Sequence, residues 1–293
     1  MKLSGSITAL VTPFKGGGVD EQSLKRLVRF QLANGTSGLV PCGSTGEAAT
    51  LGHDEYLQVI RLTAAEARGR VPVIAGVGAN DTAKAARLCR DAAGAGADAL
   101  LVLVPYYNKP TQEGIFRHFQ EAAGATDKPI VAYNIPGRTG VNMAPATLAR
   151  IAGRCRSVVA VKEASGSLDQ VSETLALCPP GFTVLSGDDS LSVPMMALGA
   201  KGVISVLSNV LPRETARMVA CALKGDFKAA ARLHLRLFPV IKALFVETNP
   251  IPVKAAAEMK GFGSAAPRLP LTPAAAATRR ALKAAFKKAG FPL

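Results

Sequence analysis

The feature that most constrains the fold is an alternation of short apolar runs with longer amphipathic stretches along residues 1–224. Eight apolar runs are bounded by turn-forming residues, which is typical of buried strands, and a stretch with helical periodicity follows each of them. The runs are mostly continuous in their apolar character, which indicates parallel strands covered on both faces. Eight strand-then-helix units in this length predict an α/β protein with a (β/α)8 TIM barrel.

The predicted strands are Ser6–Pro13, Gly38–Cys42, Val71–Val77, Ala97–Pro105, Pro129–Asn134, Val158–Lys162, Phe182–Ser186 and Gly202–Val206. The predicted helices of the barrel are Asp20–Asn34, Asp54–Arg68, Thr82–Ala93, Gln112–Ala123, Pro145–Ala152, Leu168–Leu177, Leu191–Leu198 and Pro212–Leu223. Three further helices are predicted at Phe227–Val246, Pro252–Lys260 and Pro273–Ala289. We therefore expect a catalytic barrel over 1–224 and a C-terminal helical appendage over 225–293. An open doubly wound sheet is the alternative, although no G-x-G-x-x-G motif follows the first strand.

Composition narrows the class of protein further. Hydrophobic residues make up 48% of the chain, which excludes a disordered protein. No apolar run is long enough to cross a bilayer, and the N-terminus lacks the long apolar segment of a signal peptide, so we expect a cytoplasmic protein without a membrane partner. The five cysteines and three histidines show no metal-ligand spacing, so neither a metal site nor a disulfide framework is expected.

The net charge of +14 raises the alternative of a nucleic-acid-binding protein. Its best support is a group of basic residues in the last predicted helix, at Arg279, Arg280, Lys283, Lys287 and Lys288. These residues alternate with alanines at helical spacing, which is typical of a solvated helix face. Neither an aromatic-rich basic stretch nor a zinc-finger or RNA-recognition motif accompanies them. We therefore expect no nucleic-acid partner.

One predicted strand ends in a lysine, which is the first candidate catalytic residue. The apolar run that begins at Val158 leads directly into Lys162, and a turn follows from Ala164. Two structural interpretations are open, because Lys162 could extend its ammonium group to solvent or pair with Glu163. The chemical interpretation is that apolar surroundings favour the free amine, which attacks a carbonyl carbon to form a Schiff base.

The turn after the second predicted strand combines glycines with hydroxyl groups. In Gly43-Ser44-Thr45-Gly46-Glu47 the backbone N–H groups and the two hydroxyls could hold a carboxylate. The structural interpretation is a helix N-cap at Ser44, with Glu47 completing a capping box. This motif alone leaves both interpretations open.

Polar residues also end the neighbouring predicted strands. Tyr133 can transfer a proton if its hydroxyl points into a pocket, and Arg138 in the following Gly-rich loop can bind a carboxylate through two hydrogen bonds. Tyr106 and Tyr107 follow another strand, and interface packing is the favoured interpretation of Tyr106. Because barrel active sites lie at the carboxyl ends of the strands, we expect these groups to converge on Lys162 and to favour the Schiff-base interpretation.

Five segments together carry a resemblance to a known family. They are GSTGE (43–47), YYNKP (106–110), YNIPGRTG (133–140), VKEASG (161–166) and SGDD (186–189). On these segments the chain resembles the dihydrodipicolinate synthase family of pyruvate-dependent class I lyases and aldolases, over nearly its whole length and least after Gly261. Sibling enzymes such as N-acetylneuraminate lyase share the GSTGE and lysine segments, whereas the GRTG loop is more selective.

The resemblance implies an activity in lysine and diaminopimelate biosynthesis. Pyruvate and L-aspartate 4-semialdehyde would condense to 4-hydroxy-tetrahydrodipicolinate, with no cofactor other than the covalent pyruvate imine on Lys162. A sibling aldolase acting on a sugar acid is the alternative. The resemblance implies that Tyr133, Ser44 and Tyr107 relay protons, although the family often has threonine at Ser44. It also implies that Tyr107 reaches a neighbouring subunit, and hence a homodimer or homotetramer. The substrate-binding residues that it implies are Thr45, Arg138, Gly187 and Ile204.

The resemblance further implies a degenerate regulatory site for lysine. The positions that match this site are Ala49, His53, Tyr56, Asn80, Lys84 and Tyr106. Lys84 occupies the place of an acidic residue that would pair with the amino group of the effector, and Tyr56 replaces a histidine. Because two cations repel each other in a partly buried pocket, we expect weak or absent inhibition by lysine.

Overall fold

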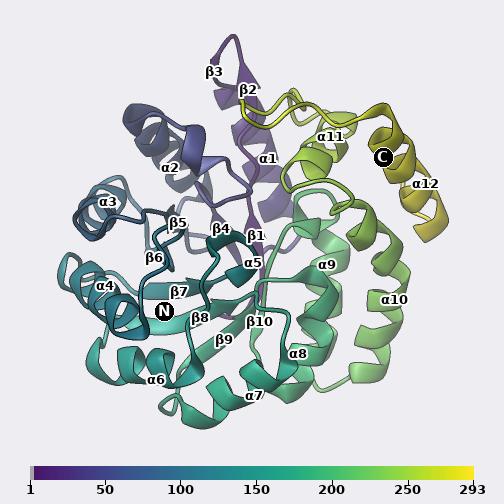
Figure 1. The fold of residues 1–293 in the computed structure, drawn as a ribbon. Helices are drawn as coiled ribbons and strands as arrows, with labels where there is room; N and C mark the ends of the chain where they lie inside the picture. The colour runs from purple at the N-terminus through teal and green to yellow at the C-terminus, as the bar shows by residue number, and fades with distance from the viewer. Residues whose placement is uncertain (1–2) are drawn as a thin grey trace.

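The computed structural model describes residues 3–293 and contains the predicted barrel (Figure 1). Eight parallel strands form one sheet in the order β4-β1-β10-β9-β8-β7-β6-β5. A parallel bridge between Leu39 of β4 and Val73, just before β5, connects the two ends of this sheet. The sheet therefore closes on itself, so the (β/α)8 prediction is confirmed and the open-sheet alternative is wrong.

Each predicted strand corresponds to one strand of the barrel. These are β1 (Gly5–Ala9), β4 (Gly38–Val40), β5 (Ile74–Val77), β6 (Ala99–Leu103), β7 (Ile130–Asn134), β8 (Val158–Glu163), β9 (Thr183–Ser186) and β10 (Gly202–Ser205). Most are shorter than predicted because the apolar run continues past the last ladder hydrogen bond. The sequence did not predict the small hairpin of β2 (Phe14–Lys15) and β3 (Gly18–Val19), which lies between β1 and the first helix.

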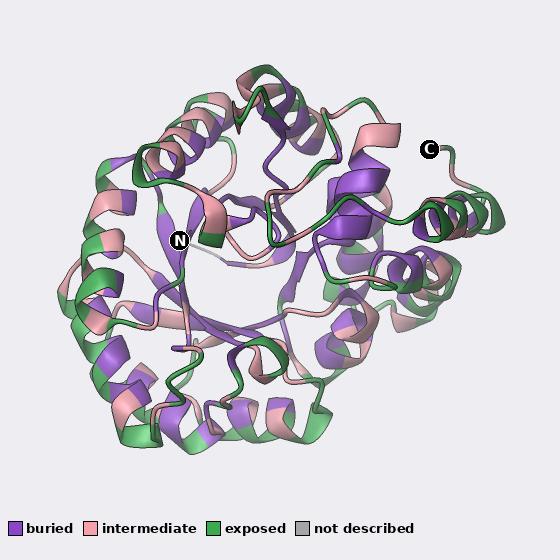
Figure 2. Cartoon of the chain, turned by 45° about the horizontal axis from the view of Figure 1, so that its top comes forward, coloured by how far each residue is buried: buried purple, intermediate pink, exposed green. Residues whose placement is uncertain are grey.

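The helices surround the strands and bury their apolar faces against them (Figure 2). The helices up to the end of the barrel are α1 (Glu21–Ala33), α2 (His53–Ala67), α3 (Thr82–Gly94), α4 (Gln112–Gly124), α5 (Pro136–Thr139), α6 (Pro145–Arg154), α7 (Leu168–Leu177), α8 (Ser192–Leu198) and α9 (Pro212–Leu223). Side-chain caps begin several of them. Asp20, for example, accepts a hydrogen bond from the backbone N–H of Ser23. The short helix α5 was not predicted, since its segment looked like a Gly-rich loop.

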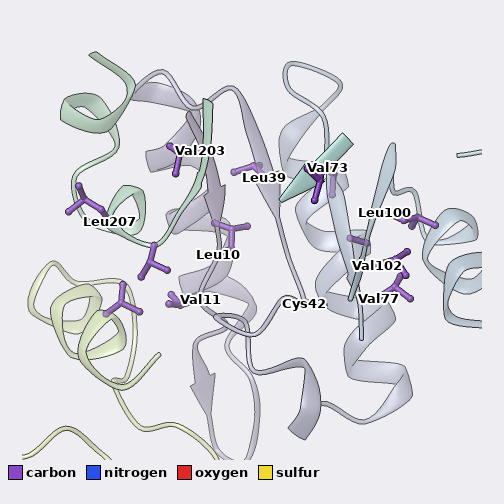
Figure 3. Packing of buried hydrophobic residues seen from close by; sticks show 14 of the residues in the cluster. Leu10, Val11, Leu39, Cys42, Val73, Val77, Leu100, Val102, Val203 and Leu207 are labelled. Carbon is purple, nitrogen blue, oxygen red and sulfur yellow. The ribbon is translucent and has the colours of Figure 1, made fainter. Parts of the chain in front are cut away.

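The pleat of the strands separates two buried layers. Leu101 of β6 and Tyr133 of β7 belong to the cluster that fills the inside of the barrel. Leu100 and Val102, which flank Leu101 on β6, belong instead to the larger cluster between the strands and the helices (Figure 3). Alternate residues of one strand therefore have different environments, as a period of two requires. The same alternation decides which side chains at the strand ends reach the mouth of the barrel.

The C-terminal helices pack on one side of the barrel. They are α10 (Phe227–Ala243), α11 (Ile251–Met259) and α12 (Ala276–Ala289). α10 packs against α9, and α12 packs against α10 and lies outermost (Figure 1). α11 returns to the mouth of the barrel, where Nζ of Lys254 donates a hydrogen bond to the carbonyl of Thr12. Within the described part of the chain, no helix combines the length and the apolar character needed to span a membrane.

Candidate active site

Lys162 lies inside the barrel, near the end of β8. Its relative exposure is 6%, and within residues 3–293 its Nζ takes part in no ion pair. The next residue, Glu163, points to the other face of the strand and accepts hydrogen bonds from Asn134, Ser165 and Gln170. Neither the solvent-extended lysine nor the Lys162–Glu163 pair therefore describes the structure, because the pleat separates the two side chains.

Tyr133 lies beside Lys162 because their strands are paired in register. β7 and β8 are parallel neighbours, and Tyr133 and Lys162 are direct partners in their ladder. Nζ of Lys162 is 4.2 Å from the centroid of the Tyr133 ring. Both side chains are almost fully buried inside the barrel. An amine and a phenol therefore share one desolvated space, which is a suitable arrangement for transferring protons during imine chemistry.

Two cavities lie at this end of the barrel. The smaller, of about 50 Å³, is lined by Lys162 and Tyr133 together with four polar residues from three other segments, which are Ser44, Thr45, Arg138 and Asn249. The larger, of about 310 Å³, shares Gly43, Ser44, Tyr133, Arg138 and Asn249 with it and extends toward Tyr106 and Leu271. The convergence expected from the strand ends is thus observed. The predicted site residues that line the small cavity are Ser44, Thr45, Tyr133, Arg138, Lys162 and Gly187.

Gly187 makes room for the lysine side chain. It follows β9, and its N–H donates a hydrogen bond to the carbonyl of Glu163 at 2.7 Å. A Cβ at this position would lie 2.7 Å from Cβ of Ala164 and 3.2 Å from Cε of Lys162. Any larger residue would therefore push against the aliphatic chain of Lys162.

The GSTGE turn places Ser44 and Thr45 on the wall of the small cavity. The capping-box interpretation is wrong, because Glu47 has a left-handed backbone with φ of 56° and its carboxylate binds distant groups. One carboxylate oxygen accepts from Nζ of Lys254 at 2.5 Å and the other from the backbone N–H of Arg268 at 2.9 Å. Helix α2 begins only at His53, so its cap is not in the GSTGE segment.

Asn249 is a site residue that the sequence did not reveal. It lies between α10 and α11, has a relative exposure of 6%, and lines both cavities. Its Nδ2 donates to Oγ1 of Thr45 at 3.0 Å, and its carbonyl accepts from Nη2 of Arg138 at 2.8 Å. Its Oδ1 is buried and has no hydrogen-bond partner among the described residues. The only sequence signal for this residue was its position before Pro250, in the short connection between two predicted helices.

Two predicted site residues lie outside the cavities. Tyr107 has a relative exposure of 86% and a left-handed φ of 72°, so its ring projects away from the barrel. Ile204 is fully buried in the cluster inside the barrel and lines neither cavity. Ile204 lies near the end of β10, as expected for a site residue, but the register places its side chain in the packed interior.

The positions expected to form a regulatory lysine site come from a short 3-10 helix, two α-helices and two loops. Ala49 and Tyr106 line the larger cavity. Tyr56 is buried in the core, where its hydroxyl donates to the carbonyl of Gly76, and burial raises its pKa well above the usual range. Lys84 is exposed on α3. The remaining two positions are His53, whose Nε2 lies 3.7 Å from Oδ2 of Asp91, and Asn80, whose carbonyl accepts from Asn108.

Over residues 3–293 no group of three or more His, Cys, Asp or Glu side chains is placed to hold an ion. Burial raises the pKa of the Cys42 thiol, which lies next to the GSTGE turn, and so disfavours the reactive thiolate form.

Comparison with known proteins identifies the family. The model of the dihydrodipicolinate synthetase family matches residues 2–289. The chain belongs to this family. A 4-hydroxy-tetrahydrodipicolinate synthase of Pelobacter propionicus is 53% identical over 286 residues, which cover 98% of either chain. The crystal structure of dihydrodipicolinate synthase from Aquifex aeolicus has a TM-score of 0.97 at 47% identity, with 99% of each chain covered. A monomeric dihydrodipicolinate synthase variant also has a TM-score of 0.97, at 44% identity, covering 99% of this chain and 97% of its own.

Proposed function

We propose that this member of the dihydrodipicolinate synthetase family condenses pyruvate with L-aspartate 4-semialdehyde to give 4-hydroxy-tetrahydrodipicolinate. This lyase reaction belongs to lysine and diaminopimelate biosynthesis. Full-length similarity to a 4-hydroxy-tetrahydrodipicolinate synthase supports the assignment. The observation that carries it at the level of chemistry is the buried Lys162, which has no carboxylate partner within residues 3–293 and lies 4.2 Å from the Tyr133 ring centroid.

The first step uses Lys162 as the nucleophile. Its free amine attacks C2 of pyruvate, and the carbonyl oxygen leaves as water, so that an imine joins Nζ to C2. The carboxylate of pyruvate would lie against the turn of Ser44 and Thr45, whose hydroxyls line the same small cavity. Burial of this cavity strengthens those hydrogen bonds, because little water competes for them.

The later steps require protons to move beside the imine. Removal of a proton from the methyl group of bound pyruvate gives an enamine, which attacks the aldehyde carbon of the semialdehyde and forms the new C–C bond. We assign this proton transfer to the phenol of Tyr133, with Ser44 as the next group along the cavity wall. The amino group of the second substrate then attacks C2 and displaces Lys162. One water is lost over the whole reaction, and the enzyme amine is regenerated.

Arg138 is the proposed site for the carboxylate of the semialdehyde. One of its nitrogens is fixed by the carbonyl of Asn249 at 2.8 Å, which orients the guanidinium group at the cavity wall. Its other guanidinium N–H groups have no hydrogen-bond partner in the described part of the chain, so they can form charge-assisted hydrogen bonds with a carboxylate. A sugar-acid substrate would not need this arginine, which favours the aspartate semialdehyde assignment.

Tyr107 supports an oligomeric enzyme. An aromatic ring that is 86% exposed, on a residue with a left-handed backbone, is energetically unfavourable in an isolated chain. We propose that it completes the site of a neighbouring subunit in a homodimer or homotetramer, which sedimentation of the free protein would test.

We also propose that the chain divides into a barrel over 1–224 and an appendage over 225–293. In this division the appendage supplies Asn249 to the site.

The decisive experiment is intact mass measurement after borohydride reduction in the presence of pyruvate. We expect a single pyruvate-sized adduct on the wild type and none on Lys162→Ala. The exposed Lys201→Ala is the matched control, and it should form the adduct as the wild type does. Absence of the adduct from the wild type would remove the proposed mechanism.

A further inference from the structure

Lys254 is a buried cation that the proposed reaction does not use. It lies on α11 with a relative exposure of 2%, and it lines neither cavity of the site. Its Nζ donates to Glu47 and to the carbonyl of Thr12 and lies 4.3 Å from the centroid of the Phe14 ring. A charge buried to this degree is found only where it is paired, and Glu47 is the partner of Lys254. The question is what this buried ion pair does for the protein.

Glu47 is the last residue of the GSTGE turn, and its carboxylate and its backbone N–H both help to hold that turn. The carboxylate is shared between Lys254 and the backbone N–H of Arg268. Its own backbone N–H donates to the carbonyl of Ser44 at 3.2 Å. Its left-handed φ of 56° is unfavourable for a residue with a side chain, so the turn depends on these contacts to keep its shape.

Two further side-chain contacts fix the same short segment, and the Arg268 side chain fixes residues that follow it. Oγ1 of Thr12 donates to the carbonyl of Gly46 at 2.7 Å, and Asn249 donates to Oγ1 of Thr45 at 3.0 Å. The side chain of Arg268 forms a bidentate ion pair with Glu55 and donates to the carbonyl of Thr50. Lys254, Arg268 and Asn249 of the C-terminal segment thus hold the turn, while Ser44 and Thr45 line the small cavity and Glu47 lines the larger one.

We propose that Lys254 is a positioning residue for the carboxylate of pyruvate. It acts through Glu47, since the ion pair sets the backbone of the turn and thereby the direction of the Ser44 and Thr45 hydroxyls. This inference rests on the proposed function, because it assumes that the turn binds pyruvate. Loss of Lys254 should weaken pyruvate binding, because the turn would no longer be held in place. Since Lys254 lines neither cavity, the amine of Lys162 should remain able to form the imine.

The test compares Lys254→Met with Glu47→Gln and with the double variant that carries both changes. Lys254→Met preserves the length of the side chain but leaves the Glu47 carboxylate buried without its cation, so it is the variant most at risk of misfolding. The double variant removes both charges, which restores electrical neutrality but not the hydrogen bond that holds the turn. Arg279→Met is the matched control, because it removes a half-exposed ion pair with Glu258 in the same C-terminal region.

We expect the double variant to fold, as judged by circular dichroism, and to raise the KM for pyruvate about tenfold or more, since small displacements of positioning groups have effects of this order. The KM for the semialdehyde should change far less, and saturating pyruvate should still give the borohydride adduct at Lys162. Arg279→Met should match the wild type. A double variant with a wild-type pyruvate KM would show that the pair has a structural role only and would overturn the inference. If the other variants do not fold, a folded Glu47→Gln variant with a wild-type pyruvate KM would also overturn the inference. Absence of the adduct from the wild type would instead be a failure of the proposed function.

Discussion

Replacing Asn249 with aspartate tests how the carboxylate end of the site is built. The two side chains have the same shape, so the packing is preserved while an N–H donor becomes a charged acceptor. Nδ2 of Asn249 is 3.0 Å from Oγ1 of Thr45. A pyruvate carboxylate bound to the other side of this hydroxyl lies one further hydrogen bond away, which separates the two negative charges by about 6 Å. At an effective dielectric constant of about 20, their repulsion is about 3 kcal/mol.

A repulsion of about 3 kcal/mol corresponds to roughly a 100-fold increase in the pyruvate KM of Asn249→Asp. The assay is initial-rate kinetics at saturating semialdehyde, with borohydride trapping as an independent measure of pyruvate occupancy. Asn249→Ala is the control, because it removes the hydrogen bond without adding charge and should cost about 1 kcal/mol, or about fivefold. If the pyruvate KM of the aspartate variant is no higher than that of the alanine variant, Thr45 does not bind this carboxylate.

Three other measurements test separate parts of the description. Arg138→Ala should raise the KM for aspartate semialdehyde by at least about tenfold and leave pyruvate trapping intact, because a charge-assisted contact of about 1.5–3 kcal/mol is lost; equal effects on both substrates would contradict the assignment. Burial lowers the pKa of His118 from 6.5 to about 4, so the unfolded state binds the proton first and the folded state should lose about 3 kcal/mol of stability as the pH falls from 6.5 to 4. Chemical denaturation of wild type and His118→Gln should show this loss in the wild type only, and parallel profiles would refute it. L-Lysine should inhibit weakly or not at all because of Lys84, and half-inhibition at micromolar lysine in a steady-state assay would show that the cation does not oppose binding.

The sequence predicted more of the fold than of the site. Each of the eight strands was located from its apolar run, since a parallel strand covered on both faces leaves this signal whatever its partners are. Strand ends were less accurate: β5 begins at Ile74 although the run starts at Val71, because a run records burial and a strand requires hydrogen bonds. The hairpin β2–β3 has only two residues in each strand, which is too short for any periodicity.

The candidate site shows the same division. Lys162, Tyr133, Ser44 and Thr45 were found because they follow apolar runs, and closure of the barrel brings all strand ends of one polarity together. A capping role for Glu47 stayed open in the sequence because a local rule fits its spacing from Ser44, and the structure shows that this interpretation is wrong. Its partner Lys254 lies 207 positions further along the chain, and no local pattern contains that pairing.

What the sequence alone determined was the alternation of buried runs and amphipathic helices, and with it the identity of the amine at the end of β8. The tertiary structure decided which polar groups meet that amine. Burial leaves a periodic signal within each segment, whereas hydrogen bonds such as those of Asn249 with Thr45 and Arg138 join segments whose separation is set only when the barrel closes and α11 folds back over its mouth.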